Sequence, residues 1–545
     1  MHALKKHLTH WRIFRDLSPS YSLNKVYEAV PSDEHEGSPI WRTRLSSIGQ
    51  GDSQIHASSP VGSHHRSSIF TAGILSTAML MNALRFLRPS FLYSRQGVNN
   101  KPYKIQPTTY LNGVRGFAAL CVYFQHYLVK YFKFLDNGYL SKPEETRYLQ
   151  LPFIRLIFTG RFMVANFFIL SGFVLSCKPL RLIRKRDPSL LDCLASSVFR
   201  RVPRLFLPLI PPMVVTAFAN YYHWYVDQPE ARPVDPNAQY PDLFNRLSEE
   251  FGIFTQIVNP FTWGTFHPSY TPHMWTLPME FRGSMVVFLS LLCLSKTKVT
   301  IRMLLLIGFA YYCLQTAHWD TFLFVSGILL AEFHLIKKDA SYSLEDFLQF
   351  INIHNKETTR YVTIMSHIFW SLVFIFALFI GSWPCDKASA TPGYVSLDLL
   401  TPQHYNSEEL HGYFWYSIAA VMIMMAFENY PILQRPFTTP LARYLGDISF
   451  AFYIIHWTFL WTIGRMITNE TIALFGKNFG FAIGAVIVIP INICVADVYW
   501  RMFDIGSVTF SRWLCIKCSI SESHVAAPRA LEMQTDTTST HNAYP

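Results

Sequence analysis

The sequence predicts an all-α, polytopic membrane protein with about ten transmembrane helices and both termini in the cytosol. The chain has 545 residues, of which 50% are hydrophobic and 16% aromatic but only 15% charged. An ordinary soluble protein carries about 25% charged residues, so this chain lacks much of the usual water-facing surface. Ten apolar runs also approach the ~20 residues that a helix needs to cross the hydrocarbon core of a bilayer.

The ten predicted spans are separated by polar loops. They cover residues 110–130, 153–177, 198–220, 275–295, 300–317, 319–337, 361–383, 413–428, 448–467 and 479–500.

The charges of the loops support this count and give the orientation. Eight basic residues, from Lys178 to Arg204, lie between the second span and the first turns of the third, whereas the next loop, 221–252, is acidic. All the basic stretches fall on one side if there are ten spans and both termini are cytosolic, as the positive-inside rule requires. The sequon Asn469-Glu-Thr471 then lies on the lumenal side, which predicts glycosylation of Asn469.

The two ends of the chain differ from the apolar middle. Residues 1–107 are polar and expected to be largely disordered, with a short apolar stretch at 68–92 that favours an interfacial helix over a span. Residues 509–545 are expected to form a cytosolic tail. The first residues contain no apolar h-region, so we expect no cleaved signal peptide, and the protein is expected in the endoplasmic reticulum, Golgi or plasma membrane.

Several function classes find little support. The net charge of +11 comes from basic residues beside apolar segments, so we expect no nucleic-acid partner. The nine cysteines form no disulfide framework. Cys515-Ile-Lys-Cys518 lacks the further ligands of a metal site, which leaves palmitoylation open. No Walker loop, dinucleotide fingerprint, HExxH or Gly-x-Ser-x-Gly motif is found, and no metal site is expected.

Arg115 and His126 form the most informative pair in the first span. Eleven residues are close to three helical turns, so both side chains project from nearly the same face, about 16 Å apart. Two interpretations fit: Arg115 snorkels to the headgroups while His126 is a core histidine, or both line a polar interior. Because an arginine at depth costs ~3 kcal/mol, the second is favoured. Histidine, with an ordinary pKa of about 6.5, can then act as a general base.

Two further motifs precede the acidic loop. Ser171-Gly172 in the second span is expected to serve helix packing first, with Ser171 also able to hydrogen-bond a neighbour or substrate. Arg200-Arg201-Val-Pro203-Arg204 enters the third span and is followed by Pro208, Pro211 and Pro212. This run fits either ordinary positive-inside flanking or a broken helix whose arginines bind a phosphorylated ligand.

The last two motifs lie in the fourth and ninth spans. Glu280 lies among apolar neighbours and needs a partner, which leaves an ion pair with an arginine, a histidine or the acceptor open; His267 and His273 before it are expected at the surface. Ser449, Tyr453 and His456 follow an i, i+4, i+7 pattern and share one stripe of a helix, with Asp447 expected to be its N-cap.

Together these motifs resemble the acyltransferase 3 family of membrane-bound O-acyltransferases. Arg115 with His126, the Phe168–Phe173 run, Arg201-Val-Pro-Arg204, Trp275 to Glu280 and Leu445 to His456 match its blocks in order across residues 108–508. Asn112 stands where the family often has Asp, and Asp504-Ile-Gly where members often have an acid followed by proline, so neither residue is given a role.

The resemblance implies ten or so helices around a site between a cytosolic acyl-CoA, most simply acetyl-CoA as co-substrate, and a hydroxylated acceptor. It implies His126, Arg115 and Glu280 as catalytic residues, and Arg201 and Arg204 as ligands of the coenzyme A phosphates. Tyr453, His456 and Ser171 become acceptor-binding candidates, and no cofactor is expected to be tightly bound. The acceptor is a carbohydrate, lipid or small metabolite. A transporter or flippase, and a scaffold without catalysis, remain as alternatives.

Overall fold

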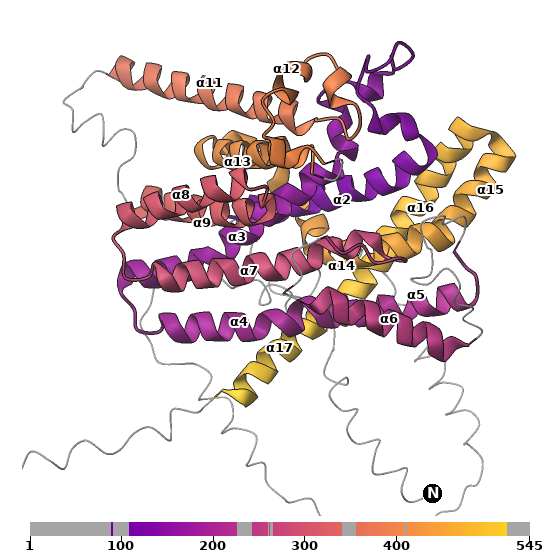
Figure 1. Ribbon diagram of the computed structural model, residues 1–545, viewed down its shortest axis with the longest axis horizontal. Coiled ribbons are helices and arrows are strands. Elements are labelled where there is room, and N and C mark those ends of the chain that lie inside the picture. The colour runs from indigo at the N-terminus through magenta and orange to yellow at the C-terminus, as the bar shows by residue number, and fades with distance from the viewer. Residues whose placement is uncertain are drawn as a thin grey trace, which may run out of the picture.

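The computed structural model of the protein describes residues 89–90, 108–225, 242–259, 261, 265–339, 356–407 and 410–519. Within these ranges it is all-helical and contains no strand, only an isolated bridge between Asn137 and Asp386. Figure 1 shows most of the helices lying side by side in one bundle. The main helices are α2 Thr109–Tyr131, α3 Gly160–Lys185, α4 Leu190–Phe206, α5 Ile210–Tyr221, α6 Leu243–Val258, α7 Thr276–Cys293, α8 Val299–Gln315, α9 Trp319–Asp339, α11 Lys356–Gly381, α13 Tyr413–Asn429, α14 Pro440–Phe459, α15 Arg465–Phe475, α16 Lys477–Tyr499 and α17 Ile505–Cys518.

A helix lies at each of the ten predicted spans. Among the described residues, six helices or continuous helical runs are long and apolar enough to cross a membrane: α3, α4 with α5, α7 with its preceding turn, α9, α11, and α16 with α17. A seventh is reached if α13 and the 3₁₀ helix Pro431–Thr438, bent by 99° against it, form one span. The protein is thus a multi-pass, all-helical membrane protein, whereas the count of ten stays a prediction.

The prediction that residues 221–252 form a loop was wrong in part. The structure contains α6, residues Leu243–Val258, at the end of that stretch. Ile253 and Ile257, one helical turn apart, are buried against the rest of the protein, while Phe251 is exposed. The helix alternates polar and apolar residues around its axis, so its mean hydropathy gave no sign of it. The expected interfacial helix at 68–92 lies outside the described residues except for Pro89 and Ser90, and the disordered segment before it lies outside them entirely.

Helices α2 and α14 run parallel and in close contact. A Cβ on Gly116 would collide with the backbone of Leu445 and Gly446, and a Cβ on Gly446 would collide with Asn112. Small residues allow helix backbones to approach in this way inside a membrane. The helices therefore bring residues about 330 positions apart in the sequence to the same level.

Helices α3 and α9 form the second close pair. Gly172 of α3 lies against the backbone of Phe324, and Gly327 of α9 lies against the backbone of Ile169 and Phe173. The expected packing role of the Ser171-Gly172 motif is explained by this contact: Gly172 lets the two helices meet. The α3–α9 pair forms the centre of the larger hydrophobic core, with Phe168 and Phe324 in ring contact at 5.4 Å.

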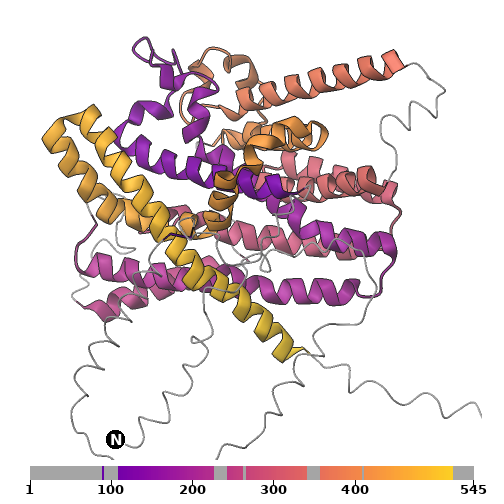
Figure 2. The same ribbon diagram turned by 180° about the vertical axis from the view of Figure 1, so that it is seen from behind.

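Several spans are interrupted without ending. Between α4 and α5 the chain makes a 3₁₀ turn at Leu207–Leu209, where Pro208 and Pro211 remove backbone donors, which fits the broken helix that was one of the two interpretations of this run. π-Helical turns at Leu460–Gly464 and Trp500–Asp504 join α14 to α15 and α16 to α17. Seen from behind in Figure 2, α16 and α17 cross the bundle diagonally.

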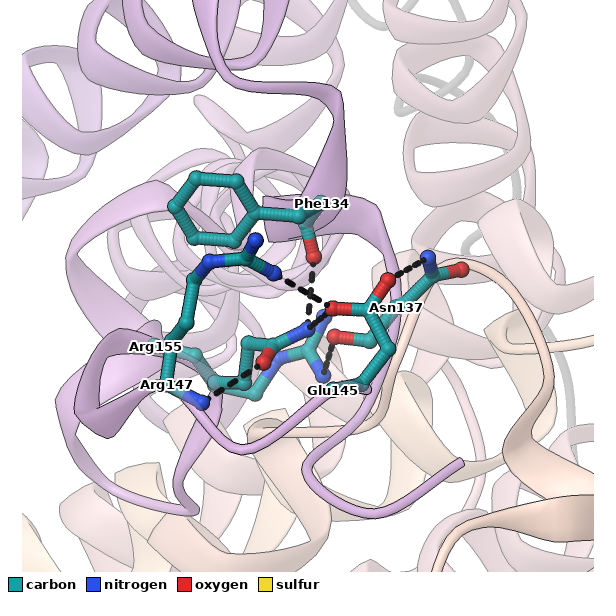
Figure 3. Close-up of polar contacts among 6 residues, drawn as sticks. Phe134, Asn137, Glu145, Arg147 and Arg155 are labelled. Atoms are coloured by element: carbon teal, nitrogen blue, oxygen red, sulfur yellow. Dashed lines mark hydrogen bonds and ion pairs between the residues drawn. The ribbon is translucent and has the colours of Figure 1, made fainter. Parts of the chain in front are cut away.

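The connection between α2 and α3 is held by the Glu145 carboxylate, as Figure 3 shows. Asn137 donates to one oxygen at 2.8 Å, and Gln150 and Arg147 donate to the other at 2.6 and 3.1 Å. Burial raises the pKa of Glu145, but these hydrogen bonds and the charge of Arg147 outweigh it and hold the pKa below its ordinary value. The folded state therefore favours the ionised carboxylate.

We expect Glu145→Gln to lower the free energy of unfolding at neutral pH by about 1 kcal/mol, because it removes a charged hydrogen-bond acceptor. A depressed pKa stabilises the fold above the ordinary value of 4.5 and loses this effect as pH falls through the folded value. Thermal unfolding of the purified protein should therefore show a difference from wild type at pH 7 that shrinks below pH ~4. Glu144→Gln, at an exposed neighbour, is the control; an equal loss in both variants would contradict the role of Glu145.

Candidate active site

Three histidine side chains from three separate segments meet beside α14. His126 comes from α2, His273 from the 3₁₀ turn Pro272–Trp275 that leads into α7, and His456 from α14. The ring centroids of His126 and His456 are 5.4 Å apart and stacked, and those of His273 and His456 are 4.7 Å apart. Trp457 contacts both His126 and His273. We call His126, His273 and His456 the histidine cluster.

Backbone carbonyls fix which ring nitrogens carry hydrogen in two of the three. Nδ1 of His456 lies 2.7 Å from the carbonyl oxygen of Tyr453, and Nε2 of His273 lies 3.2 Å from that of Ile454. Because a carbonyl oxygen only accepts, these nitrogens are N–H donors. The other nitrogens, Nε2 of His456 and Nδ1 of His273, are buried and have no hydrogen-bond partner in the described structure. Each neutral ring thus keeps one free acceptor nitrogen.

Tyr453 connects the histidine cluster to α7. Its hydroxyl donates to the carbonyl oxygen of His273 and lies 2.6 Å from Oγ1 of Thr276. Of the predicted stripe on α14, Tyr453 and His456 therefore belong to one polar group. Ser449 does not join them, because its hydroxyl donates to the carbonyl of Gly446 in its own helix.

Glu280 forms an ion pair with an arginine, one of the three partners left open for it. Arg201 of α4 pairs with the Glu280 carboxylate and donates through Nε to Ser284 Oγ at 2.9 Å. The two side chains are only 13% and 16% exposed, so each neutralises a charge that would otherwise be costly to bury. Glu280 also lies close enough to Tyr453 to interact with it electrostatically. The ion pair thus stands next to the polar group around Tyr453.

Arg115 lies near the other end of α2, among acidic residues. It interacts electrostatically with both Asp447 and Asp504, and Arg204 interacts with Asp504 as well. Asn112 donates to Asp447 at 2.7 Å. Arg115 and Arg204, which the sequence places far apart, therefore approach the same carboxylate.

The polar residues form a series along α2 and α14. Because these helices are parallel, Arg115 is level with Asp447 at one end and His126 is level with His456 three turns further on. Glu280, paired with Arg201, interacts electrostatically with Tyr453, one helical turn before His456. A long ligand with an anionic end and a reactive end matches this order of charged and neutral groups.

The comparisons with known proteins agree with this arrangement. A model of the acyltransferase 3 family, described as an acyltransferase domain, matches residues 108–501. The chain belongs to the acyltransferase 3 family. As a member, it is an acyl-transferring enzyme, which rules against the transporter and scaffold alternatives.

Fungal relatives of this acyltransferase carry matching names. The O-acetyltransferase PaAT-1 of Phomopsis amygdali is 29% identical, covering 79% of this chain and 88% of the relative. Acyltransferase clz18 of Cochliobolus lunatus is 22% identical (67% and 84%), and acyltransferase R4 of a Phoma species is 21% identical (67% and 86%). No solved structure matches. Of these three names, that of PaAT-1 states transfer to oxygen.

Two expectations about the site were wrong. His273 was expected at the surface but is 2% exposed in the acyltransferase, while His267, six residues earlier, is exposed as predicted. Asp447 was expected to be an N-cap, but α14 begins at Pro440 and is capped by Thr439, so Asp447 lies inside the helix and accepts from Asn112. The Asp447 error arises because α14 begins eight residues before the predicted apolar run, and the His273 error arises because a 3₁₀ turn buries the segment that leads into α7.

Other predicted site residues lie away from the histidine cluster or make no contact with it. Ser171 has no hydrogen-bond partner among the described residues, and next to it Gly172 serves packing. Asn469 is half-buried in α15, and its amide oxygen accepts from Tyr131 at 3.1 Å. The described residues contain no group of three His, Cys, Asp or Glu side chains placed to hold a metal. Substrate binding by Ser171 and glycosylation of Asn469 stay predictions.

No role was predicted for Asn112 or Asp504, because Asn112 replaces the Asp of the acyltransferase family and Asp504 lacks the proline that often follows it. In the structure Asn112 hydrogen-bonds Asp447, and Asp504 is 9% exposed beside Arg204 and Arg115. An Asp at position 112 would place a second carboxylate against Asp447. Both positions are polar residues within apolar runs, and this was the one feature of the sequence that could have marked them as part of the site.

We expect the ion pair of Arg201 and Glu280 to behave as a unit. Arg201→Gln and Glu280→Gln each leave a partly buried charge unpaired, a change that costs about 3–5 kcal/mol in fully buried pairs and less here. The double variant should therefore be more stable than the sum of the single losses predicts, as measured by thermal unfolding in detergent. Arg200→Gln, outside the pair, is the control. Strictly additive losses would contradict the coupling.

Proposed function

We propose that the protein is an acyl-CoA-dependent O-acyltransferase of the membrane that transfers an acetyl group to a hydroxyl of a carbohydrate, lipid or small metabolite. The observation that carries this proposal is the series of polar groups that joins the arginines at one end of α2 and α14 to the histidine cluster at the other. The printed name of the relative from Phomopsis amygdali, an O-acetyltransferase, supports acetyl as the acyl group.

In the proposed mechanism His126 is the general base. Its neutral imidazole removes the proton from the acceptor hydroxyl as the oxygen attacks the thioester carbonyl carbon. The tetrahedral intermediate then collapses, the carbon–sulfur bond breaks, and the coenzyme A thiolate leaves and takes up the proton from His126. A covalent acetyl-histidine, formed when His126 itself attacks the thioester, is the alternative.

Arg115 acts on the donor in this scheme. Eleven residues of helix place it about 16 Å from His126, too far to touch the reacting carbonyl. Its position near Arg204, which shares Asp504 with it, suits the anionic end of coenzyme A. Arg204 and Arg201 would contact the phosphates, and Glu280 would orient Arg201 through their ion pair.

The acceptor hydroxyl would lie at the histidine cluster. His456 offers its free Nε2 as a hydrogen-bond acceptor, and Tyr453 holds the segment of His273 in place. Ser171 stays a candidate for acceptor contact. His273, which the sequence placed at the surface, joins this group through its own free Nδ1.

The proposed orientation has ten spans and both termini in the cytosol, in the endoplasmic reticulum, Golgi or plasma membrane. It follows from the basic loops and places the arginines on the side where acyl-CoA is made available. Asn469 would then face the lumen, where glycosylation occurs.

We expect His126→Ala to lower acetyl transfer by at least about 100-fold, the usual contribution of a positioned general base. The assay follows label from radioactive acetyl-CoA into products in membranes containing the protein, with palmitoyl-CoA compared as donor. His267→Ala, at an exposed histidine, is the control and should keep wild-type turnover. Full activity of the His126 variant at equal expression would sink the assignment.

We expect Arg204→Gln to raise the KM for acetyl-CoA about tenfold, as the loss of a charged hydrogen bond implies. Acetyl-pantetheine, which carries the thioester without the nucleotide phosphates, should be used equally well by wild type and variant. The matched control is Arg200→Gln, because Arg200 donates to a carbonyl of its own helix. A KM increase that is the same for both donors would assign Arg204 to the fold instead of the phosphates.

A further inference from the structure

A second polar group, which none of the motifs includes, lies beside the histidine cluster. Glu250 of α6 is 4% exposed, and neither of its carboxyl oxygens has a hydrogen-bond partner in the described structure. Buried polar groups are nearly always hydrogen-bonded, and a buried carboxyl without a partner is costly. An unpartnered acid on the buried face of α6, beside Ile253 and Ile257, therefore indicates that something else completes its hydrogen bonds.

The surroundings of Glu250 are rich in hydroxyl groups. Tyr225 interacts with Glu250 electrostatically, and its hydroxyl lies 3.4 Å from Oγ1 of Thr216 and 3.5 Å from Oγ1 of Thr458. The two threonine hydroxyls are 3.0 Å apart. Tyr270 also interacts with Glu250. These residues come from α5 and the segment after it, α6, α14 and the segment before α7, so the fold brings them together.

This group is continuous with the histidine cluster. Tyr270 is three residues before His273 in the same segment, and the hydroxyl of Thr271 between them is buried without a partner among the described residues. Ile253 and Ile257 of α6 pack into the same hydrophobic core as Trp457, which contacts His126 and His273. The Tyr225 hydroxyl also lies 3.5 Å from Oγ1 of Thr458, the residue that follows Trp457 in α14, so the two groups meet along this helix.

We propose that Glu250, Tyr225 and Thr271 bind the acceptor, and that the acceptor is an uncharged compound with at least two hydroxyl groups. One hydroxyl reaches His126, and a second hydrogen-bonds the Glu250 carboxyl. This inference rests on the proposed function, since it assigns the acceptor of the same reaction.

The charge state of Glu250 supports a neutral ligand. Burial raises the pKa of Glu250 to about 8, the negative charge of Glu249 adds to this rise, and Arg246 opposes it. Arg246 is itself held by an ion pair with Glu249 at 3.2 Å and by a hydrogen bond to Tyr270 at 2.9 Å. The charged and titratable groups that face Glu250 are Glu249, Arg246, Tyr270 and Tyr225. At neutral pH the carboxylic acid is protonated, so it can both donate to and accept from a hydroxyl.

The test compares Glu250→Gln with Glu250→Ala. The acceptor used is the compound whose acylation is lost in cells lacking this protein, added to membranes with radioactive acetyl-CoA. Glu250→Ala should raise the KM for the acceptor about tenfold and leave the KM for acetyl-CoA unchanged, because a hydrogen bond to a buried group is lost. Glu250→Gln keeps a neutral group of the same shape and should keep the KM near wild type.

The pH dependence gives an independent readout. In the wild type the KM for the acceptor should rise above pH 8, as Glu250 loses its proton, and in Glu250→Gln this rise should be absent. Gln256→Ala, at an exposed position of α6, is the control and should leave both KM values unchanged. The KM for acetyl-CoA reports on correct folding of each variant.

Two outcomes would overturn the inference. If Glu250→Gln raises the acceptor KM as much as Glu250→Ala, the ionised carboxylate binds a cationic acceptor instead. If neither variant changes the acceptor KM while His126→Ala abolishes transfer, Glu250 is not part of the acceptor site and the proposed function still stands. Retained transfer by His126→Ala would instead remove the proposed function on which the inference rests.

Discussion

The close approach of α2 and α14 determines where most of the site lies. Gly116 and Gly446 let the two backbones meet without side chains between them, and the parallel direction of the helices keeps them in register. Asn112 is thereby placed against Asp447 and His126 against His456, three turns apart. The same contact therefore orders both the charged end and the histidine end.

The buried arginines and carboxylates named here form ion pairs with one another. Arg201 with Glu280 and Arg282 with Asp320 are paired, and the carboxylate of Glu332 pairs with both Arg184 and Arg302. Such pairs do not stabilise a fold strongly, but breaking one is costly, so they favour a single arrangement of the helices. Within the described residues no hydrogen bond or ion pair joins a carboxylate to a ring of the histidine cluster. The buried charges are thus paired with one another and not with the rings of the histidine cluster.

The sequence predicts the helical class, the positions of the main helices and most of the residues that face the interior, because these follow from hydropathy and from the spacing of polar residues within apolar runs. It does not predict which polar residues meet. Whether Glu280 pairs with Arg201 or with a histidine depends on the rotation of α4 against α7, which no local pattern encodes. His273 was misplaced because a short segment with two prolines looks like a surface loop, although tertiary contacts with α14 bury it. Likewise α6 has the composition of a loop, and only its packing against the core makes it a helix that carries Glu250.

Among the residues that the structure describes, the histidine cluster has no carboxylate partner, and this bears on the proposed chemistry. In a buried site an imidazolium without a counter-charge is strongly disfavoured, so the base begins the reaction neutral, as proton removal requires. When His126 takes up the proton, the new positive charge lies next to the negative oxygen of the tetrahedral intermediate, and the two charges compensate one another. A fixed carboxylate beside His126 would stabilise the imidazolium before the acceptor arrives and would favour the protonated, inactive form. Neutral neighbours with tautomers set by backbone carbonyls avoid this, and they leave the free nitrogens of His273 and His456 to hold the acceptor hydroxyl. On this argument the charged residues of the protein serve the donor and the fold, while the transfer step depends on groups that are neutral at rest.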